Sequence, residues 1–321
     1  MIIFGTRDVG PLKYLLALEN QFENVSWMSS KRTMPYLSNK QKLSRIKNKP
    51  FSLVVTGTSL GDSIDKKLIK IAKSLEIISV SIIEHWSWYK KRFAINGNMI
   101  LPNHIIVNDE YAKIGAINEG LPEEKIFIGG NPYLEQISKL KLSNINVELW
   151  KKKNNIKGKK IILFITEALK KSFLIGTDDY LGYDEFQVLD DLIEILPENS
   201  VLLIKTHPEE EKYKYEHLQS SRVKVFHQKN IEEMVQIPDI IIGMASMLLI
   251  ELAMFRDDII SYRPNARKSF VGEKIGATHY AKTKSQLKKY LADPPSSSSM
   301  PFRNKFEGSG KRISKFLNSL I

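Results

Sequence analysis

The chain has 321 residues, of which 42% are hydrophobic and 26% charged, and a formal net charge of +12. This is the composition of a folded protein with room for two domains, and no apolar run reaches the roughly 18 residues that span a bilayer, which excludes an integral membrane protein. The absence of Cys excludes disulfides and thiolate sites and agrees with a reducing compartment. We therefore expect a cytoplasmic protein.

The excess of Lys and Arg favours anionic partners. Nucleotide-sugars and the anionic lipids at the inner face of the plasma membrane both qualify, the membrane surface as a weak, reversible partner. Nucleic acid is not expected, because the basic clusters are not accompanied by a helix-turn-helix, zinc or aromatic RNA-binding signature.

Strand-like apolar runs alternate with helix-length amphipathic segments, which predicts βαβ units and parallel sheets. The expected strands of the first half are Ile2–Phe4, Val25–Met28, Leu53–Thr56, Ile78–Ile83, Ile105–Val107 and Ile126–Ile128. Those of the second half are Ile161–Ile165, Val201–Lys205, Val223–Phe226, Ile240–Ile242 and Ile259–Ser261.

Residues 139–160 separate the two sets of strands, and they are rich in Lys and Asn and poor in large apolar residues. A domain boundary is expected there. The prediction is a doubly wound α/β domain over residues 1–140, a second over 141–309, and a helix over 310–321. This helix has one apolar face, made of Ile313, Phe316, Leu317 and Leu320.

The first strand is followed by a glycine-containing turn, Gly5-Thr-Arg-Asp8-Val-Gly10. The turn lacks the Gly-x-Gly-x-x-Gly spacing of dinucleotide sites, and no Gly-Lys-Ser/Thr of a P-loop follows it, so NAD and ATP sites lose their main support. Gly5 and Gly10 still allow close backbone approach. Asp8 is either a general base at the end of the strand or the N-cap of a helix expected over Pro11–Glu23.

Polar and aromatic residues follow the third and fourth strands. Thr58 and Ser59 either cap the next helix or hold a substrate hydroxyl. The run from Glu84 to Phe93 is dense in aromatic and basic groups. Three interpretations stay open: a packed inter-domain aromatic cluster, an acceptor pocket in which Glu84 or His85 acts as an acid or base, or stacking of a sugar or a base on Trp86.

The second half carries the most informative stretch, residues 200–251. One strand ends in Lys205-Thr-His207-Pro208, with Pro208 suited to the first turn of a following helix. Another strand leads to a helix that begins at Ser246. Ligands of open parallel sheets bind beyond the carboxyl ends of the strands, and a helix N-terminus there favours phosphate. These residues predict a nucleotide-activated substrate.

Other candidate contacts for the same ligand are Thr166, Glu167, Met244, Met247 and Glu251. Thr166 and Glu167 follow the first strand of the second half, and Glu251 could reach ribose hydroxyls from the helix after Ser246. The alternative for Glu251 is a solvated or salt-bridged side chain, and for Ser246 a plain N-cap.

These segments resemble the GT-B glycosyltransferase superfamily, specifically bacterial surface-polysaccharide transferases related to the CDP-glycerol glycerophosphotransferase and UDP-N-acetylglucosamine 2-epimerase groups. The resemblance covers most of residues 1–265, and its matching segments are Gly57–Gly61, Glu84–Phe93, Pro102–Asp109, Gly120–Pro132, Lys205–Pro208 and Asp239–Tyr262. It implies two Rossmann-like domains facing a central cleft, with the C-terminal helix returning to the N-terminal domain.

The resemblance also implies roles for the two domains. The first would hold the acceptor, with Asp8, Glu84 and His85 as catalytic candidates and Gly5, Gly10, Thr58, Ser59 and Trp86 on the acceptor side. The second would hold the donor, with His207, Ser246 and Glu251 at matching positions. No metal and no cofactor are expected, since helix dipoles and basic groups would stabilise the leaving group.

The expected function is a metal-independent, inverting glycosyltransferase that moves a sugar from a UDP-, CMP- or CDP-linked donor to a bacterial surface glycan or a lipid-linked precursor. The alternatives are a nucleotide-sugar epimerase or hydrolase, a CDP-polyol phosphotransferase, and a non-catalytic glycan- or nucleotide-binding protein. The chain departs from the epimerase pattern, a Ser-Gly-Gly followed by paired glutamates, at Ser246 to Glu251. It also lacks the aromatic, paired serines and aspartate of the phosphotransferases.

Overall fold

The computed structural model describes residues 1–37, 51–173, 177, 179–226, 230–296 and 300–321. The chain forms two compact units, and each is described by itself. Unit 1 comprises Met1–Lys139 and Asn304–Ile321, and unit 2 comprises Leu140–Arg303.

Unit 1 contains a parallel six-stranded sheet in the order β2-β1-β3-β4-β7-β8. Its strands are β1 (Ile2–Thr6), β2 (Val25–Ser29), β3 (Leu53–Thr56), β4 (Ile78–Ile83), β7 (His104–Val107) and β8 (Ile126–Ile128). Its helices include α1 (Val9–Glu19), α2 (Ile64–Ser74), α3 (Glu110–Asn118), α4 (Pro132–Ser138) and α13 (Ser309–Asn318). The direction of strand addition reverses between β1 and β3, so ligand-binding residues are expected beyond the carboxyl ends of these strands.

Unit 2 repeats this plan, with a parallel sheet in the order β11-β10-β9-β12-β13-β14. Its strands are β9 (Lys160–Ile165), β10 (Ser200–Lys205), β11 (Val223–Phe226), β12 (Ile240–Gly243), β13 (Ile259–Tyr262) and β14 (His279–Ala281). Its helices are α5 (Val147–Lys153), α6 (Leu169–Ser172), α7 (Glu185–Glu194), α8 (Ile231–Gln236), α9 (Met247–Leu252), α10 (Val271–Lys274) and α11 (Lys284–Ala292), and α12 (Met300–Asn304) leads back to unit 1. Here the strand order reverses between β9 and β12.

Both sheets are buried because helices pack on them, and their central strands are almost continuous Ile, Leu and Val. No apolar side chain in two of these central strands is more than 2% exposed: Ile161–Ile165 in β9 and Ile240–Ile242 in β12. The predicted α/β fold of two Rossmann-like, doubly wound domains is therefore confirmed.

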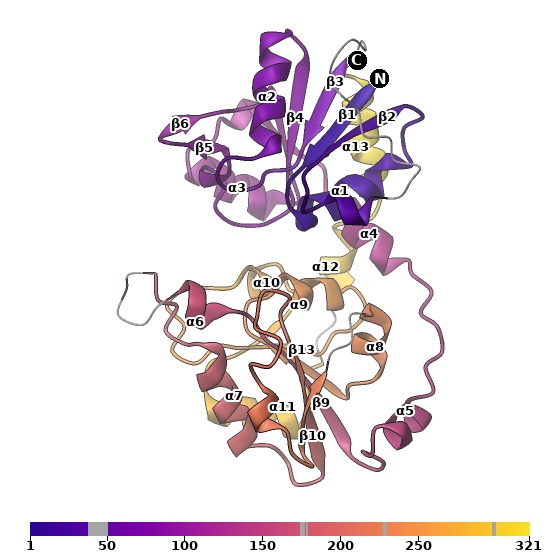
Figure 1. The fold of residues 1–321 in the computed structure, drawn as a ribbon, viewed down its shortest axis with the longest axis vertical. Coiled ribbons are helices and arrows are strands. Elements are labelled where there is room, and N and C mark those ends of the chain that lie inside the picture. Colours follow the sequence, from indigo (N-terminus) through magenta and orange to yellow (C-terminus); the bar gives the residue numbers. More distant parts are fainter. Residues whose placement is uncertain (38–50, 174–176, 178, 227–229, 297–299) are drawn as a thin grey trace. The chain divides into compact units, whose positions relative to one another are not determined.

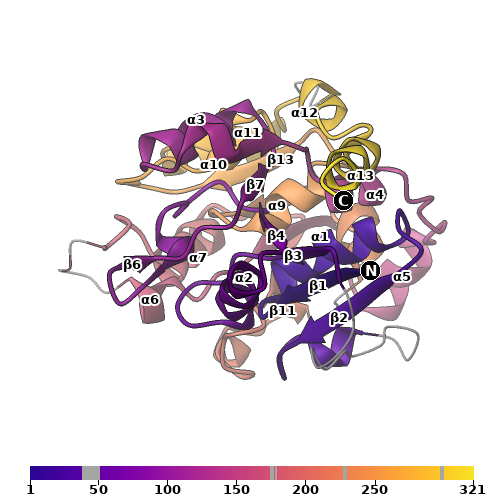
Figure 2. The ribbon, with the colours of Figure 1, turned by 90° about the horizontal axis from the view of Figure 1, so that it is seen from above.

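The C-terminal helix α13 belongs to unit 1, where it lies beside α1 and α4 (Figure 1), and Figure 2 shows the same neighbours from above. Ile313 and Leu317 are fully buried in the core of this unit, and Phe316 stacks on Phe127 with ring centroids 4.1 Å apart. The carboxylate of Glu135 on α4 accepts hydrogen bonds from two N–H groups at the start of α13. The prediction that the terminal helix returns to the N-terminal domain is confirmed.

Three local expectations differ from the structure. The first helix begins at Val9, two residues before Pro11, and ends at Glu19. Pro208 does not start a helix, because residues 208–215 form successive turns. A short hairpin of β5 (Ala94–Ile95) and β6 (Asn98–Met99) was not predicted. Its turn residues, Asn96 and Gly97, are a common hairpin sequence, and both adopt positive φ.

Among the residues that the structure describes, no helix is long and apolar enough to cross a membrane.

Candidate functional site

In unit 1, polar residues follow β1, β3 and β4 at the same edge of the sheet. Glu84 comes directly after β4, and its side chain is 15% exposed. One carboxylate oxygen, Oε1, lies 3.8 Å from Nη1 of Arg92, and the other, Oε2, has no hydrogen-bond partner among the described residues. Burial raises the pKa of Glu84, and the guanidinium of Arg92 offsets this only in part. A carboxyl group of this kind is suited to proton transfer.

Gly10 explains why Glu84 can lie so close to the backbone of α1. A Cβ atom at position 10 would come within 3.2 Å of Glu84 Oε1, so a larger residue would crowd the carboxylate. Gly5 has a different role, because a Cβ there would overlap Leu68 and approach the carbonyl oxygen of Met28. Of the two predicted glycines, Gly10 bears on the candidate carboxylate, and Gly5 allows packing within unit 1.

His85 and Trp86 follow Glu84 but differ from it in their surroundings. Burial, reinforced by the charge of Arg92, lowers the pKa of His85 to about 3, which keeps the ring neutral at physiological pH. Its Nδ1 lies 3.0 Å from the hydroxyl of Ser87. Trp86 is 5% exposed and donates a hydrogen bond from Nε1 to Asp109 at 2.9 Å. The ring of Trp86 belongs to the core of unit 1, which favours the packed aromatic cluster over stacking on a sugar or a base.

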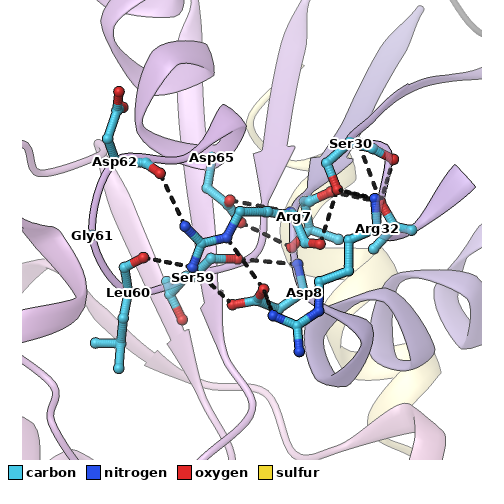
Figure 3. A network of polar contacts seen from close by, with 12 residues as sticks. Arg7, Asp8, Ser30, Arg32, Ser59, Leu60, Gly61, Asp62 and Asp65 are labelled. Carbon is cyan, nitrogen blue, oxygen red and sulfur yellow. Dashed lines mark hydrogen bonds and ion pairs between the residues drawn. The ribbon is translucent and has the colours of Figure 1, made fainter. Parts of the chain in front are cut away.

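Asp8 lies in a network of ion pairs that Figure 3 shows. Its carboxylate contacts Arg7 at 3.2 Å and Arg32 at 3.5 Å. It makes no capping hydrogen bond to α1, although its backbone has the extended conformation of an N-cap. The Asp8 carboxylate is engaged by two guanidinium groups, whereas Glu84 Oε2 has no hydrogen-bond partner among the described residues, so Glu84 fits the role of general base better than Asp8 does.

The loop after β3 is held by three cationic side chains. Its five successive carbonyl oxygens, from Thr58 to Asp62, all accept hydrogen bonds from Arg7, Lys66 or Arg92. Arg7 reaches the carbonyl oxygens of Leu60 and Asp62 (Figure 3), Lys66 those of Ser59 and Gly61, and Arg92 that of Thr58. The loop is therefore fixed in one conformation next to Asp8.

The two hydroxyl groups predicted for this loop are used inside unit 1. Thr58 is 2% exposed and donates to the carbonyl oxygen of Ile82, and Ser59 is 1% exposed and accepts from the N–H of Asp8. Neither caps α2, whose N-cap is Ser63. Their burial does not support the expected contact with a substrate hydroxyl.

In unit 2, Glu167 and Ala245 lie at the ends of β9 and β12, where the strand order reverses. The N–H of Ala245 donates to Glu167 Oε2 at 2.6 Å. Burial raises the pKa of Glu167 to about 7, against the opposing effects of this hydrogen bond and of the Arg263 charge. Glu167 is therefore a carboxyl group that can exchange a proton near neutral pH.

We expect the pKa of Glu167 to appear in the pH dependence of stability. The folded-state pKa lies above the ordinary value of 4.5, so the stability gained from the protonated form is complete below about pH 4.5 and is lost as the pH rises through about 7. Glu167→Gln keeps an acceptor for Ala245 and cannot ionise. Relative to the wild type, this variant should gain roughly 3 kcal/mol between pH 4.5 and pH 8 in urea-unfolding measurements. A difference that is independent of pH would contradict the raised pKa.

The end of β10 carries the predicted cation and imidazole. Lys205 Nζ donates to the carbonyl oxygen of Thr206 at 2.7 Å, and the Nδ1 atom of His207 accepts from the N–H of Glu209 at 3.2 Å. His207 is partly exposed and Pro208 exposed. Thr166, at the end of β9, accepts from the N–H of His207 at 3.1 Å. The predicted residues Thr166, Lys205 and His207 are thus neighbours in the structure.

The residues predicted around Ser246 fall into two groups. Ser246 caps α9, accepting from the N–H of Leu248, and Met247 and Glu251 are partly exposed on that helix. Met244 is completely buried, which does not support the predicted ligand contact of its side chain. The helix α9 has six residues, so its dipole is that of one and a half turns, and a phosphate site would depend on the side chains nearby.

No group of three or more His, Asp and Glu side chains with the arrangement of a metal site occurs in the described part of the chain.

Three functional candidates were missed from the sequence: Arg7 and Arg92, which hold the loop after β3, and Glu210, which contacts Thr166 and His207. Arg92 lies inside the run that drew attention to Glu84. Glu210 is one of three consecutive Glu residues, and nothing in the local sequence separates it from its neighbours.

No protein-family model and no curated protein matches the sequence. Solved structures do match along the whole chain. The UDP-GlcNAc 2-epimerase of Methanocaldococcus jannaschii has a TM-score of 0.65 and 17% identity, with 99% of each chain covered. The UDP-GlcNAc 2-epimerase of Neisseria meningitidis, bound to UDP-GlcNAc, has a TM-score of 0.64 and 14% identity, with 99% of this chain and 100% of that chain covered. Anabaena HepE in complex with UDP-glucose has a TM-score of 0.62 and 10% identity, with 99% of this chain and 94% of that chain covered.

These similarities establish the GT-B type of fold. They also correct the expected activity, since the whole-chain matches include UDP-GlcNAc 2-epimerases from several organisms and thereby favour the epimerase alternative over a glycosyltransferase. The physical difference is that an epimerase acts on one substrate and needs no second molecule as acceptor. The roles assigned above to an acceptor therefore lose their basis.

Proposed function

We propose that this protein is an enzyme that binds a UDP-sugar and epimerises its sugar. The observation that carries the proposal is the environment of Glu84, a largely buried carboxyl group with a raised pKa and one oxygen without a partner among the described residues. The matching structures support it, because proteins of this fold are UDP-GlcNAc 2-epimerases and two of their structures contain bound UDP-GlcNAc.

We propose that the carbon next to the anomeric carbon of the UDP-sugar loses its proton and receives a proton on the opposite face. The electron pair of the C–H bond forms a double bond to the anomeric carbon as the C–O bond to UDP breaks and UDP leaves. Return of UDP to the anomeric carbon, with protonation of the neighbouring carbon on the other face, gives the epimer. A general base for this step works best when its pKa lies close to the working pH, which burial achieves for a Glu. In our proposal, Glu84 transfers the proton and Arg92, 3.8 Å away, limits the rise in its pKa.

Nucleotide binding is assigned to unit 2 and to the ends of β9 and β10. Lys205 and His207 are groups that can donate hydrogen bonds to phosphate oxygens, and Thr166 lies against the same loop. In the proposed reaction these side chains stabilise the charge of the nucleotide, and neither a metal ion nor a cofactor takes part.

The proposal is tested by incubating the protein with UDP-GlcNAc as the sole substrate in D₂O and following the sugar by ¹H NMR. We expect a new epimer of the UDP-sugar that carries deuterium at the inverted carbon. Conversion that occurs only when an acceptor alcohol is added would contradict the proposal. Binding of UDP-GlcNAc with no conversion at all would identify a binding protein and not an enzyme.

Replacing His207 with Ala is expected to weaken UDP binding by about tenfold or more, since a charge-assisted hydrogen bond contributes about 1.5–3 kcal/mol. The melting temperature should hardly change, because the side chain is partly exposed. Isothermal titration calorimetry with UDP measures the effect, and His217→Ala, at an exposed position of the same unit, is the matched control. If His207→Ala mainly unfolds the protein, His207 is a structural residue.

A further inference from the structure

The carboxylate of Glu210 is a buried point of connection in unit 2. Its side chain is 1% exposed, and both oxygens are occupied. Oε1 accepts from the hydroxyl of Tyr215 at 2.5 Å and from Nζ of Lys214 at 2.8 Å. Oε2 accepts from the hydroxyl of Thr166 and from the N–H of His207, the latter at 2.8 Å. Three of these donors lie within five residues of Glu210, and the fourth, Thr166, lies 44 residues away at the end of β9.

Two of these donors belong to the ends of neighbouring strands. Thr166 follows β9, and its N–H donates to the carbonyl oxygen of Lys205, the last residue of β10, at 3.0 Å. The hydroxyl of Thr166 donates to Glu210 and accepts from the N–H of His207. The N–H of Glu210 donates to the carbonyl oxygen of His207 at 3.1 Å and closes a turn. Glu210 thus ties residues 205–207 to the end of β9.

Lys214 and three hydrogen-bond donors stabilise the negative charge of Glu210. Lys214 also contacts the carboxylate of Glu185, whose side chain is 1% exposed. Burial opposes the ionisation of Glu210, but the hydrogen bonds from Lys214, Thr166, Tyr215 and the N–H of His207 outweigh it and lower its pKa. The carboxylate therefore stays ionised and remains an acceptor for all four donors at neutral pH.

The turn closed by Glu210 also determines how His207 presents its ring. Nδ1 accepts from the N–H of Glu209, so in the neutral ring the proton is on Nε2. The Nε2–H group is a hydrogen-bond donor. It can therefore bind an acceptor, such as a phosphate oxygen, but not another hydrogen-bond donor.

We propose that Glu210 is a positioning residue, which holds the loop of residues 205–207 so that Lys205 and His207 Nε2 present hydrogen-bond donors to the phosphates of a nucleotide. The proposal rests on the nucleotide binding proposed for unit 2. Glu210 itself does not touch the nucleotide, and its effect is transmitted by the N–H of His207 and the hydroxyl of Thr166.

The test compares UDP affinity in the full-length protein with Glu210 replaced by Ala or by Gln. Glu210→Ala removes all four acceptor contacts and should raise the Kd for UDP at least tenfold. Glu210→Gln loses the same charge but keeps an oxygen that can accept from Thr166 and His207, so it should recover much of the affinity. Glu211→Gln, an exposed carboxylate next in sequence, is the control and should bind as the wild type does.

A spectroscopic measurement separates positioning from a general loss of structure. The ¹⁵N chemical shifts of the His207 ring report which nitrogen carries the proton. We expect the Nε2–H form in the wild type and in Glu210→Gln, and a mixture of forms in Glu210→Ala, all measured without UDP. If Glu210→Ala does not fold, Thr166→Val breaks the same connection from β9 and should reproduce the loss of affinity and the shift change.

Two results would overturn the inference. The first is a Kd for UDP equal to that of the wild type in Glu210→Ala or, if that variant does not fold, in Thr166→Val. The second is an equal loss of UDP affinity in Glu210→Ala and Glu210→Gln, because the charge alone would then be responsible. Failure of the wild type to bind UDP would instead contradict the proposed function. The ring shifts of the ligand-free protein would then still decide whether Glu210 orients His207.

Discussion

Replacing Glu84 with Gln is expected to lower the rate of UDP-sugar epimerisation by a factor of about 10²–10⁴, the usual contribution of general acid–base catalysis. Gln has nearly the same shape but cannot accept the proton. Because the Glu84 carboxylate is largely buried and one oxygen lacks a partner among the described residues, the neutral amide should not lower the melting temperature. Turnover measured by NMR, together with a thermal melt, tests both parts of this prediction.

The pH dependence provides a second measurement on the same residue. Glu84 must be ionised to accept a proton, so activity falls as the pH drops through its pKa. Because this pKa is raised, the fall should begin at a higher pH than for an ordinary Glu, and the Gln variant should show no such limb. Glu124→Gln, at an exposed position of unit 1, is the control. Wild-type turnover in Glu84→Gln would remove Glu84 from the mechanism.

Shortening the buried residues of α13 should produce the largest loss of stability. Ile313→Ala and Leu317→Ala each remove a side chain that is fully buried in unit 1, and each should cost about 2–5 kcal/mol in the free energy of unfolding. Trp fluorescence in urea is a suitable measurement, because Trp27, Trp86 and Trp88 all belong to unit 1 and report on its unfolding.

Lys315→Ala, on the exposed side of the same helix, is the matched control and should change stability by less than about 0.5 kcal/mol. Deleting residues 309–321 should prevent unit 1 from reaching its native stability. If the truncated protein unfolds normally but no longer binds anionic vesicles, α13 is a membrane anchor and its apolar face has another role.

The fold could be predicted from the sequence because strands and helices differ in pattern. Runs such as Ile161–Ile165 and Ile240–Ile242 are too short and too β-branched for helices, and each is bounded by polar or small residues. The edge strand β14 was missed because His279-Tyr-Ala contains no apolar run. It forms a strand because it pairs with β13, which the local sequence does not show.

The sequence selected candidate residues but not the contacts between them. Strand-end logic selected Glu84, Thr166 and His207, because parallel strands bring their carboxyl ends to one edge. Strand-end position could not show which polar groups are buried and hydrogen-bonded within the protein. Trp86 and Met244 proved to be core residues, which follows from packing between segments far apart in sequence. Glu210 was missed because nothing in the local sequence shows that its carboxylate accepts from Thr166, 44 residues away, as well as from its close neighbours His207, Lys214 and Tyr215.

The return of α13 to unit 1 has a consequence for the order in which the protein can fold during synthesis. Translation adds residues from the N-terminus at about 5–20 per second, and domains generally fold as units as they emerge. Unit 2 is a continuous segment, whereas unit 1 needs Asn304–Ile321, which are made after all of unit 2. The first 139 residues must therefore wait, with the surface that Ile313 and Leu317 will cover still exposed, until the ribosome has finished unit 2.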